Sequence, residues 1–362
     1  MRIIYYAQRY RPEFEAISKE IQLLSSHFSQ TNETKIHDLH LDGLFNFTLK
    51  KNFLSAHFLY YPFLIPSTHN QSKKTDINHI YTSLGDLPYL NILNLKNTIL
   101  TAAASCSEEK IKKRLPKLQQ LKQIIVESEY QEKQLLKLNI PKEKITIIHP
   151  PVDLTRFSYQ EPEKIELSEQ KQQKKQPFTI LYASCPTRKE DFEKRGINLI
   201  AAVAKEEEST EIVFDLAWRS GALKEINQLV EKNNLKNIHI NNEIVADMNT
   251  KYGKAHCTII PYTQFDDYLK LIPNSAIESL AAGKPILVSE KTEMANIVKK
   301  TGCGIVFEPT SKGLSDAIKK LRKNYSFYQK QCRKTAQQYF SKDLFLEKYT
   351  KIYKELIFKE NE

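Results

Sequence analysis

Short uninterrupted apolar runs alternate with segments of helical periodicity along the first half of the chain. Ile3–Tyr6 is an apolar run of the kind found in strands buried on both faces, and Glu13–Phe28 places apolar residues three and four positions apart. The same patterns predict strands at 77–82, 98–103, 123–126 and 145–148, and a helix at 129–138. Because strands alternate with helices, we expect a parallel sheet with crossover helices.

A polar stretch separates this half from a second one with the same alternation. Residues 158–177 are rich in Gln, Lys and Glu and have little to bury, which predicts an interdomain linker. Beyond the linker the pattern predicts strands at 178–183, 211–216, 238–240, 257–261, 286–288 and 305–307, and helices at 197–205, 223–233, 247–255 and from 313 onward. The predicted fold is α/β, with one doubly wound, Rossmann-like parallel sheet in each of two domains, 1–157 and 178–339. Ligands of such sheets bind at the carboxyl ends of the strands, so we expect a cleft between the domains.

The segment KLIPNSAIESLAAGKPILVS, residues 270–289, predicts a short helix followed directly by a buried strand. Ser275 and Glu278 have the spacing of a capping box, and Gly283 stands where a left-handed residue would end the helix. The free N–H groups at such a helix start form an anion site, most naturally for a diphosphate. Glu278, one turn in, could accept hydrogen bonds from two adjacent sugar hydroxyls, or it could only cap its own helix.

Composition narrows the class of protein. At 362 residues and 41% hydrophobic content, the chain has enough material for two packed cores. We found no run of about 18 uncharged apolar residues, so we expect no transmembrane helix, and the start MRIIYYAQ reads as a strand rather than a signal peptide. The net charge of +11 fits nucleic acid, an anionic membrane face or a phosphorylated substrate, but much of it is Lys on helix surfaces, where solvation explains it.

The cysteines and histidines offer no metal or disulfide pattern. Five cysteines are dispersed without a C-x-x-C pair, which predicts reduced thiols and a cytoplasmic location, with the inner membrane surface as an alternative site. Nine histidines are equally dispersed and form no H-x-x-x-H, so we expect neither a metal nor another cofactor. The basic residues form no nucleic-acid recognition motif, and we expect no nucleic-acid partner.

Several stretches then resemble, in order and spacing, the glycosyltransferases of family 4, which have the two-domain GT-B fold. The likeness extends over about 123–356 and is carried by VES with the helix and strand that follow it to Phe157, by EKRG before INLIAAVA, by AHCTIIP, by the segment 270–289, by GCG at 302–304, and by FSKDLFLEKYTKIYKEL near the end. The resemblance implies transfer of a sugar from a nucleoside diphosphate sugar to an acceptor hydroxyl, with retention of configuration and no obligatory metal. It also implies that the terminal helix, 340–362, crosses back onto the first domain.

The family's motif of two glutamates separated by seven residues assigns roles in the segment. Glu278 matches the second glutamate, which binds the nucleotide ribose. The first falls on Lys270, so a cation stands where the family contacts the donor sugar; Lys270 could pair with a phosphate or a donor carboxylate, or simply face solvent. Ser275 and Ala276 would present backbone N–H groups to the diphosphate, with Asn274 sharing the cap.

Cationic residues of the second domain match the family's diphosphate ligands. Arg195 aligns with the Lys that precedes the family's glycine, here Gly196, and Lys194 beside it is the fallback. An Arg offers a bidentate fork for phosphate oxygens, which makes the replacement chemically sound. Arg188 is a further candidate near the end of the preceding strand. For each of the three, the alternative is an ordinary surface charge.

The first domain departs further from the family. His79 resembles a histidine near the family's reaction centre, and the alternative for it is a structural histidine. The glycine-rich loop expected after the first strand is replaced by QRYRPEFE, in which Arg9 or Arg11 could contact phosphate or acceptor.

A basic and aromatic patch at 45–66 could hold a lipid-linked saccharide acceptor or dock on an anionic membrane, or it could be core. The absent glycines and Lys270 together keep a second hypothesis open, a non-catalytic GT-B scaffold that partners an active enzyme.

Overall fold

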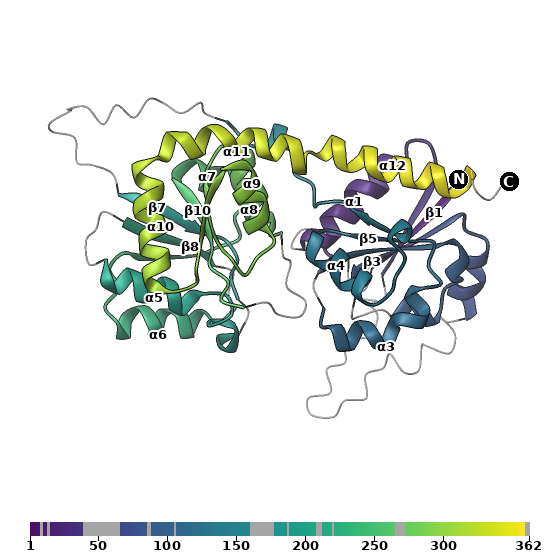
Figure 1. Cartoon of the computed structure of the whole chain (residues 1–362), viewed down its shortest axis with the longest axis horizontal. Coiled ribbons are helices and arrows are strands. Elements are labelled where there is room, and N and C mark those ends of the chain that lie inside the picture. The colour runs from purple at the N-terminus through teal and green to yellow at the C-terminus, as the bar shows by residue number, and fades with distance from the viewer. Residues whose placement is uncertain are drawn as a thin grey trace. The chain divides into compact units, whose positions relative to one another are not determined.

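The computed structural model describes most of the chain as two compact units. The described residues are 1–7, 10–12, 15–38, 66–84, 88–104, 106–159, 177–186, 188–207, 212–218, 221–264 and 272–358. The first unit consists of Met1–Pro150 and Phe345–Glu362, and the second of Pro151–Asp266 and Leu271–Leu344. Each unit has one six-stranded parallel sheet with helices packed on it (Figure 1). The predicted α/β class with two parallel sheets is confirmed.

The first sheet has the strand order β2-β1-β3-β4-β5-β6. Its strands are β1 (Arg2–Ala7), β2 (Glu33–Asp38), β3 (Ile77–Ser83), β4 (Thr98–Ala104), β5 (Gln123–Val126) and β6 (Ile145–Ile147). The helices of this unit are α1 (Ala16–Phe28), α3 (Glu108–Leu118), α4 (Glu129–Lys137) and most of α12 (Lys342–Phe358), and residues 66–73 are also helical. Short 3-10 turns are η1 (Pro88–Asn91), η2 (Leu95–Asn97) and η3 (Lys142–Lys144). The strand order reverses between β1 and β3.

Alternation along the strands sends side chains to two different cores. Ile4 and Tyr6 of β1 belong to the core beneath α3 and α4. Ile3 and Tyr5 point the other way, into the core that α1 and α12 cover. Because both faces are covered, all five apolar residues after Arg2 in β1 are buried, as expected of a doubly wound parallel sheet.

The second sheet has the strand order β12-β11-β10-β7-β8-β9. Its strands are β7 (Phe178–Tyr182), β8 (Ile212–Trp218), β9 (Ile238–Asn242), β10 (Cys257–Ile260), β11 (Ile286–Ser289) and β12 (Gly304–Phe307). Its helices are α5 (Ile197–Glu206), α6 (Leu223–Lys232), α7 (Asn249–Lys254), α8 (Asn274–Ala281), α9 (Met294–Thr301), α10 (Ser311–Lys323) and α11 (Tyr325–Phe340), with the 3-10 turns η4 (Leu154–Arg156) and η5 (Lys189–Asp191). In this sheet the order reverses between β7 and β10.

The helix-to-strand turn expected in the 270–289 segment is present. Helix α8 ends at Ala281, and Gly283 follows with φ of 72°, in the left-handed region that favours glycine. A Cβ on Gly283 would lie 2.6 Å from the ring of Tyr159, so the position also has no room for a side chain. Strand β11 then begins at Ile286 and is completely buried.

The boundary between the units differs from the boundary expected from sequence. Residues 151–157 belong to the second unit rather than the first. The N–H of Val152 donates to the Phe340 carbonyl at 2.7 Å, and the N–H of Lys342 donates to the Val152 carbonyl at 3.1 Å. The ammonium of Lys342 also lies 2.7 Å from the carboxylate of Asp153. The chain therefore enters and leaves the second unit at one paired segment.

Helix α12, near the C-terminal end of the sequence, contributes side chains to the core of the first unit. Phe345, Tyr349 and Tyr353 are buried there beside residues of α1, β1 and β3. Figure 1 shows α12 running alongside α1. The terminal helix thus packs on the first sheet.

Candidate functional site

The carboxyl ends of β7 and β10 flank the point where the second sheet reverses its strand order. In open α/β sheets this switch point leaves a crevice in which ligands bind. The loop after β7 reaches the first turn of α8, because the hydroxyl oxygens of Ser184 and Ser275 lie 3.3 Å apart. Tyr182, the last residue of β7, fixes this loop by donating its hydroxyl to the Ser184 carbonyl at 2.6 Å. Two segments predicted from sequence to hold a donor, the loop after β7 and the start of α8, therefore meet at one edge of the sheet.

Helix α8 starts differently from the predicted capping box. Pro273 is the N-cap residue, and no side chain caps the helix. Ser275 lies inside the first turn, and the N–H of Ala276 donates to the Pro273 carbonyl at 3.0 Å. The N–H of Ala276 therefore has an acceptor within its own helix, and its role as a diphosphate donor stays a prediction. The first N–H groups of a helix have no acceptor in their own helix, so Asn274 and Ser275 supply the donors at this end.

Glu278 is held by a tyrosine rather than by its own helix. The hydroxyl of Tyr252, on α7, donates to Oε2 of Glu278 at 2.9 Å. Glu278 is half-buried, whereas Tyr252 is completely buried, and burial together with the neighbouring carboxylate raises the pKa of the Tyr252 hydroxyl. Tyr252 thus remains a neutral donor, and the carboxylate stands one turn from the positive end of the α8 dipole.

Arg195 lies on the segment between β7 and α5. Its guanidinium donates to the Tyr262 hydroxyl at 3.2 Å and lies 5.3 Å from the centre of that ring. The pKa of Arg195 is affected most by burial, which lowers it, yet the nearby hydroxyls of Tyr262 and Tyr182 raise it overall. Tyr262 follows β10, so the cation is carried to the carboxyl edge at the switch point.

Gly196 explains how Arg195 comes so close to β10. Its φ is 74°, and a Cβ at this position would lie 1.9 Å from the carbonyl oxygen of Pro261. A side chain at residue 196 would push the segment that carries Arg195 away from the loop after β10. Position 196 therefore requires glycine, because of its positive φ and its close approach to Pro261.

The remaining predicted cations lie nearby with different surroundings. Arg188 has a side chain that is 70% exposed, and its guanidinium pairs with Asp191 at 3.3 Å. Lys194 is half-buried, and its carbonyl accepts from the N–H of Thr263 at 3.1 Å. The carboxamide oxygen Oδ1 of Asn274 is buried and, among the described residues, has no hydrogen-bond partner. A buried acceptor of this kind is satisfied when a ligand supplies a donor.

His79 occupies a different environment from the one expected of a catalytic residue. It is completely buried, with Nδ1 2.6 Å from the Tyr353 hydroxyl and Nε2 2.7 Å from the Thr101 hydroxyl. Burial lowers the pKa of His79 to about 3. A residue with no exposed surface and both ring nitrogens bonded within the core does not reach a substrate, so its position supports the structural alternative.

Other sequence-based expectations fall outside the described residues. Lys270, Arg9 and almost all of the patch at 45–66 lie there, and the linker is described only at its ends. Arg11 is described, and its N–H donates to the Ser18 hydroxyl at 2.9 Å.

No cluster of three metal-binding side chains occurs among the residues searched, which are those described. In the same part of the chain, no helix is long and apolar enough to cross a membrane. All five cysteines have free thiols.

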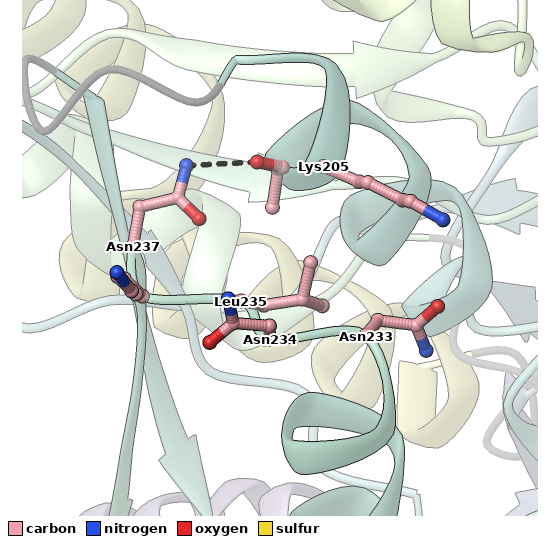
Figure 2. A pocket seen from close by; sticks show the side chains of 7 residues that line it. Lys205, Asn233, Asn234, Leu235 and Asn237 are labelled. Atoms are coloured by element: carbon pink, nitrogen blue, oxygen red, sulfur yellow. Dashed lines mark hydrogen bonds between the residues drawn. The ribbon is translucent and has the colours of Figure 1, made fainter.

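A cavity of 320 Å³ lies at the opposite edge of the second sheet (Figure 2). It is lined by residues at the end of α5 and just before β9, among them Lys205, Asn234 and Lys236. The side-chain amide of Asn237 donates to the Ala204 carbonyl at 3.1 Å and closes its floor. Because this edge carries the amino ends of the strands, the cavity is separate from the switch point.

Two tyrosines of the site carried no recognisable signal in the sequence. Tyr252 and Tyr262 contact Glu278 and Arg195 from positions that are remote along the chain. A buried tyrosine usually donates its hydroxyl to a polar partner, so tyrosines near a candidate site in the sequence indicate possible hydrogen-bond partners for the polar groups of that site. Finding the partners themselves requires the fold.

Solved structures with low sequence identity share this fold over nearly their whole length. Sucrose-phosphate synthase from Thermosynechococcus elongatus matches with a TM-score of 0.75 and 15% identity, covering 98% of this chain and 99% of that one. Anabaena HepE in complex with UDP and glucose matches with a TM-score of 0.73 and 10% identity, covering 98% and 100%. WaaG, a glycosyltransferase involved in lipopolysaccharide biosynthesis, matches with a TM-score of 0.65 and 15% identity, covering 97% and 99%. The two doubly wound units therefore have the GT-B fold.

A family model matches the sequence of the second unit. Residues 163–339 match the family model for glycosyl transferases group 1. That segment contains the whole candidate site from Arg188 to Glu278. No curated protein matches the chain.

Proposed function

We propose that the protein transfers a sugar from a nucleoside diphosphate sugar to an acceptor hydroxyl, with retention of configuration. The observation that carries this proposal is the meeting of the α8 N-terminus, Arg195 and Glu278 at the switch point of the second sheet. A helix start and a guanidinium provide positive charge for a diphosphate, and a carboxylate one turn away provides acceptors for a ribose. These are the parts needed to hold a nucleoside diphosphate.

The same groups supply the chemistry of the proposed transfer. The glycosidic bond breaks as negative charge grows on the leaving diphosphate, and donors fixed before the reaction stabilise that charge. The donors would be the N–H groups of Asn274 and Ser275 and the side chain of Arg195. Lys194 and Arg188 would be neighbouring cations. Because these groups are cationic or dipolar, the proposed transfer needs no metal ion. Lys270 would then contact the donor sugar or its phosphate.

For the acceptor, we propose a growing cell-surface polysaccharide or a glycolipid. Support comes from WaaG, which has the same fold and is involved in lipopolysaccharide biosynthesis. The aromatic and basic sequence at 45–66 is compatible with a lipid-linked saccharide. A donor with UDP is supported in the same way by HepE, whose structure contains UDP and glucose.

Thermal-shift measurements against uridine, guanosine and adenosine diphosphates and their common sugars test the proposal. A ligand at 100 times its Kd stabilises the folded state by about 2.7 kcal/mol, so one nucleotide series should raise the Tm clearly. Glu278→Ala should abolish the shift. The unchanged protein should also transfer or hydrolyse the sugar of the nucleotide sugar that stabilises it most. A flat response across the whole panel would contradict nucleotide binding.

A second candidate is a GT-B scaffold without transferase activity. It is favoured by two features of the sequence, the cation Lys270 where the resemblance predicts a glutamate and the absence of glycines from the loop after the first strand. Nucleotide binding without any turnover of nucleotide sugars, and with no change on Lys270→Glu, would support this alternative.

A further inference from the structure

Tyr252 is bound to the candidate site through a single hydroxyl group. Its oxygen lies 2.9 Å from Oε2 of Glu278 and 3.3 Å from the Ser275 carbonyl. The hydroxyl has one proton, and a charged acceptor at the shorter distance forms the stronger bond. The carboxylate of Glu278 is therefore the main acceptor, and the α8 backbone receives at most a weak contact.

The tyrosine itself has almost no freedom to move. Tyr252 has no exposed surface, and the ring of Phe157 meets it edge-on at 5.9 Å between centres. The start of α7 is also fixed, because Asn249 accepts from the Ser158 N–H and donates to the Ser158 hydroxyl, both at 3.0 Å. A donor fixed in this way sets the rotation of the carboxylate it binds.

Fixing this carboxylate matters because a free glutamate side chain samples many rotamers. Ordering such a side chain costs conformational entropy, and a site that is ordered before binding avoids that cost. A carboxylate offers about four acceptor positions, so the same group can accept from Tyr252 and from a vicinal diol. The two hydroxyls of a ribose are such a diol, whereas a 2′-deoxyribose has only one of them.

We propose that Tyr252 is a positioning residue that makes the site select nucleoside diphosphates with a 2′-hydroxyl, by holding Glu278 in the orientation that accepts both ribose hydroxyls. This inference rests on the proposed function, because it takes Glu278 to be the ribose ligand. It adds a determinant of sugar selectivity on α7, which has no other part in the site.

The test compares Tyr252→Phe with the unchanged protein by calorimetric titration. The ligands are UDP, GDP and ADP and their 2′-deoxy counterparts, and the readout is the ratio of the two dissociation constants. Losing the 2′-hydroxyl bond to a charged group should weaken binding to the unchanged protein about tenfold or more. In Tyr252→Phe the ratio should fall to about threefold or less, since the carboxylate is no longer oriented.

A matched control removes a different tyrosine hydroxyl. Tyr325 donates to the His256 carbonyl at 2.8 Å, just before the amino end of β10 and away from the switch point. Tyr325→Phe should leave the ratio unchanged. A purely structural effect of Tyr252→Phe would weaken both ligands equally and leave the ratio intact. If Tyr252→Phe does not fold, Glu278→Asp keeps the charge but withdraws it from Tyr252, and it should lower the ratio in the same way.

The outcomes separate this inference from the function on which it rests. If the unchanged protein binds none of the six nucleotides, the proposed function and the inference both fail. If it binds them but does not prefer ribose, or if Tyr252→Phe retains the full preference, only the role of Tyr252 is overturned. A reduced ratio in Tyr252→Phe, with Tyr325→Phe unaffected, supports it.

Discussion

Acidification should destabilise the first unit through His79. The imidazole is neutral in the core, because one ring nitrogen donates and the other accepts in its bonds to the hydroxyls of Tyr353 and Thr101. A protonated ring would need two acceptors and would place a charge in a fully buried position. Burial therefore lowers the pKa of His79 to about 3, from an ordinary value of about 6.5.

The sign and size of the effect follow from proton linkage. Between pH 6.5 and 3 the unfolded chain binds a proton at His79 that the folded protein does not bind. The free energy of unfolding is therefore highest above pH 6.5 and falls as the pH decreases toward 3. Each pH unit well below 6.5 removes about 1.4 kcal/mol, so the loss from pH 7 to pH 5 is about 2 kcal/mol.

Urea unfolding at pH 7, 6 and 5 measures this loss as a difference between two proteins. His79→Gln cannot titrate, so its stability deficit relative to the unchanged protein should shrink by about 2 kcal/mol between pH 7 and pH 5. Tryptophan fluorescence would report on the second unit, because Trp218, the chain's single tryptophan, lies there. Far-UV circular dichroism and hydrogen exchange of β3 are therefore the suitable probes for the first unit. A deficit that stays constant with pH would refute the reasoning.

Further substitutions test the site of the second unit. In urea unfolding, Gly196→Ala should lower the free energy of unfolding by about 2–4 kcal/mol, because residue 196 has a positive φ and a Cβ there would contact Pro261. The control Gly253→Ala lies in open space on α7 and should be neutral or stabilising by up to about 1 kcal/mol. In titration calorimetry, Arg195→Gln should weaken nucleoside diphosphate binding about 10- to 100-fold. Arg188→Gln should weaken it less than about threefold, because the Arg188 side chain is exposed, and equal losses would contradict the assignment of Arg195 as the diphosphate ligand. Lys270→Ala should raise the KM for the nucleotide sugar, and a weaker Kd for the free diphosphate would identify the phosphate rather than the sugar as its partner. An unchanged KM would place Lys270 outside the site.

The interior strands were predictable from sequence, and the polar elements were not. Apolar runs such as those of β1 and β11 are buried on both faces and match the predicted strands closely. Strand β2 was missed because ETKIHD is an edge strand without a fully buried side chain. Helix α3 was missed because its sequence is mostly charged and contains Pro116, with Ile111 and Leu118 its only fully buried residues. Hydrophobic patterning detects an element only to the extent that the element is buried.

The components of the site could be predicted from sequence more readily than their partners. Arg195 and Glu278 were singled out by motif, but the Ser275–Glu278 spacing predicted a capping box that does not form. The actual partner of Glu278 is Tyr252, and no local rule connects positions so far apart along the chain. His79 illustrates the same limit, because its burial depends on tyrosines of α12 at the other end of the sequence.

The paired segment at the boundary of the second unit also has a consequence for the ends of that unit. The chain passes between them at Pro150–Pro151 and again within the first turn of α12, at 344–345. Proline rings fix φ at the first passage, and helical hydrogen bonds stiffen the second. Since Val152 and Lys342 are bonded together just inside the second unit, both passages are anchored to the same point. The second unit is therefore closed at one point, and breaking these backbone hydrogen bonds should loosen both of its ends at once.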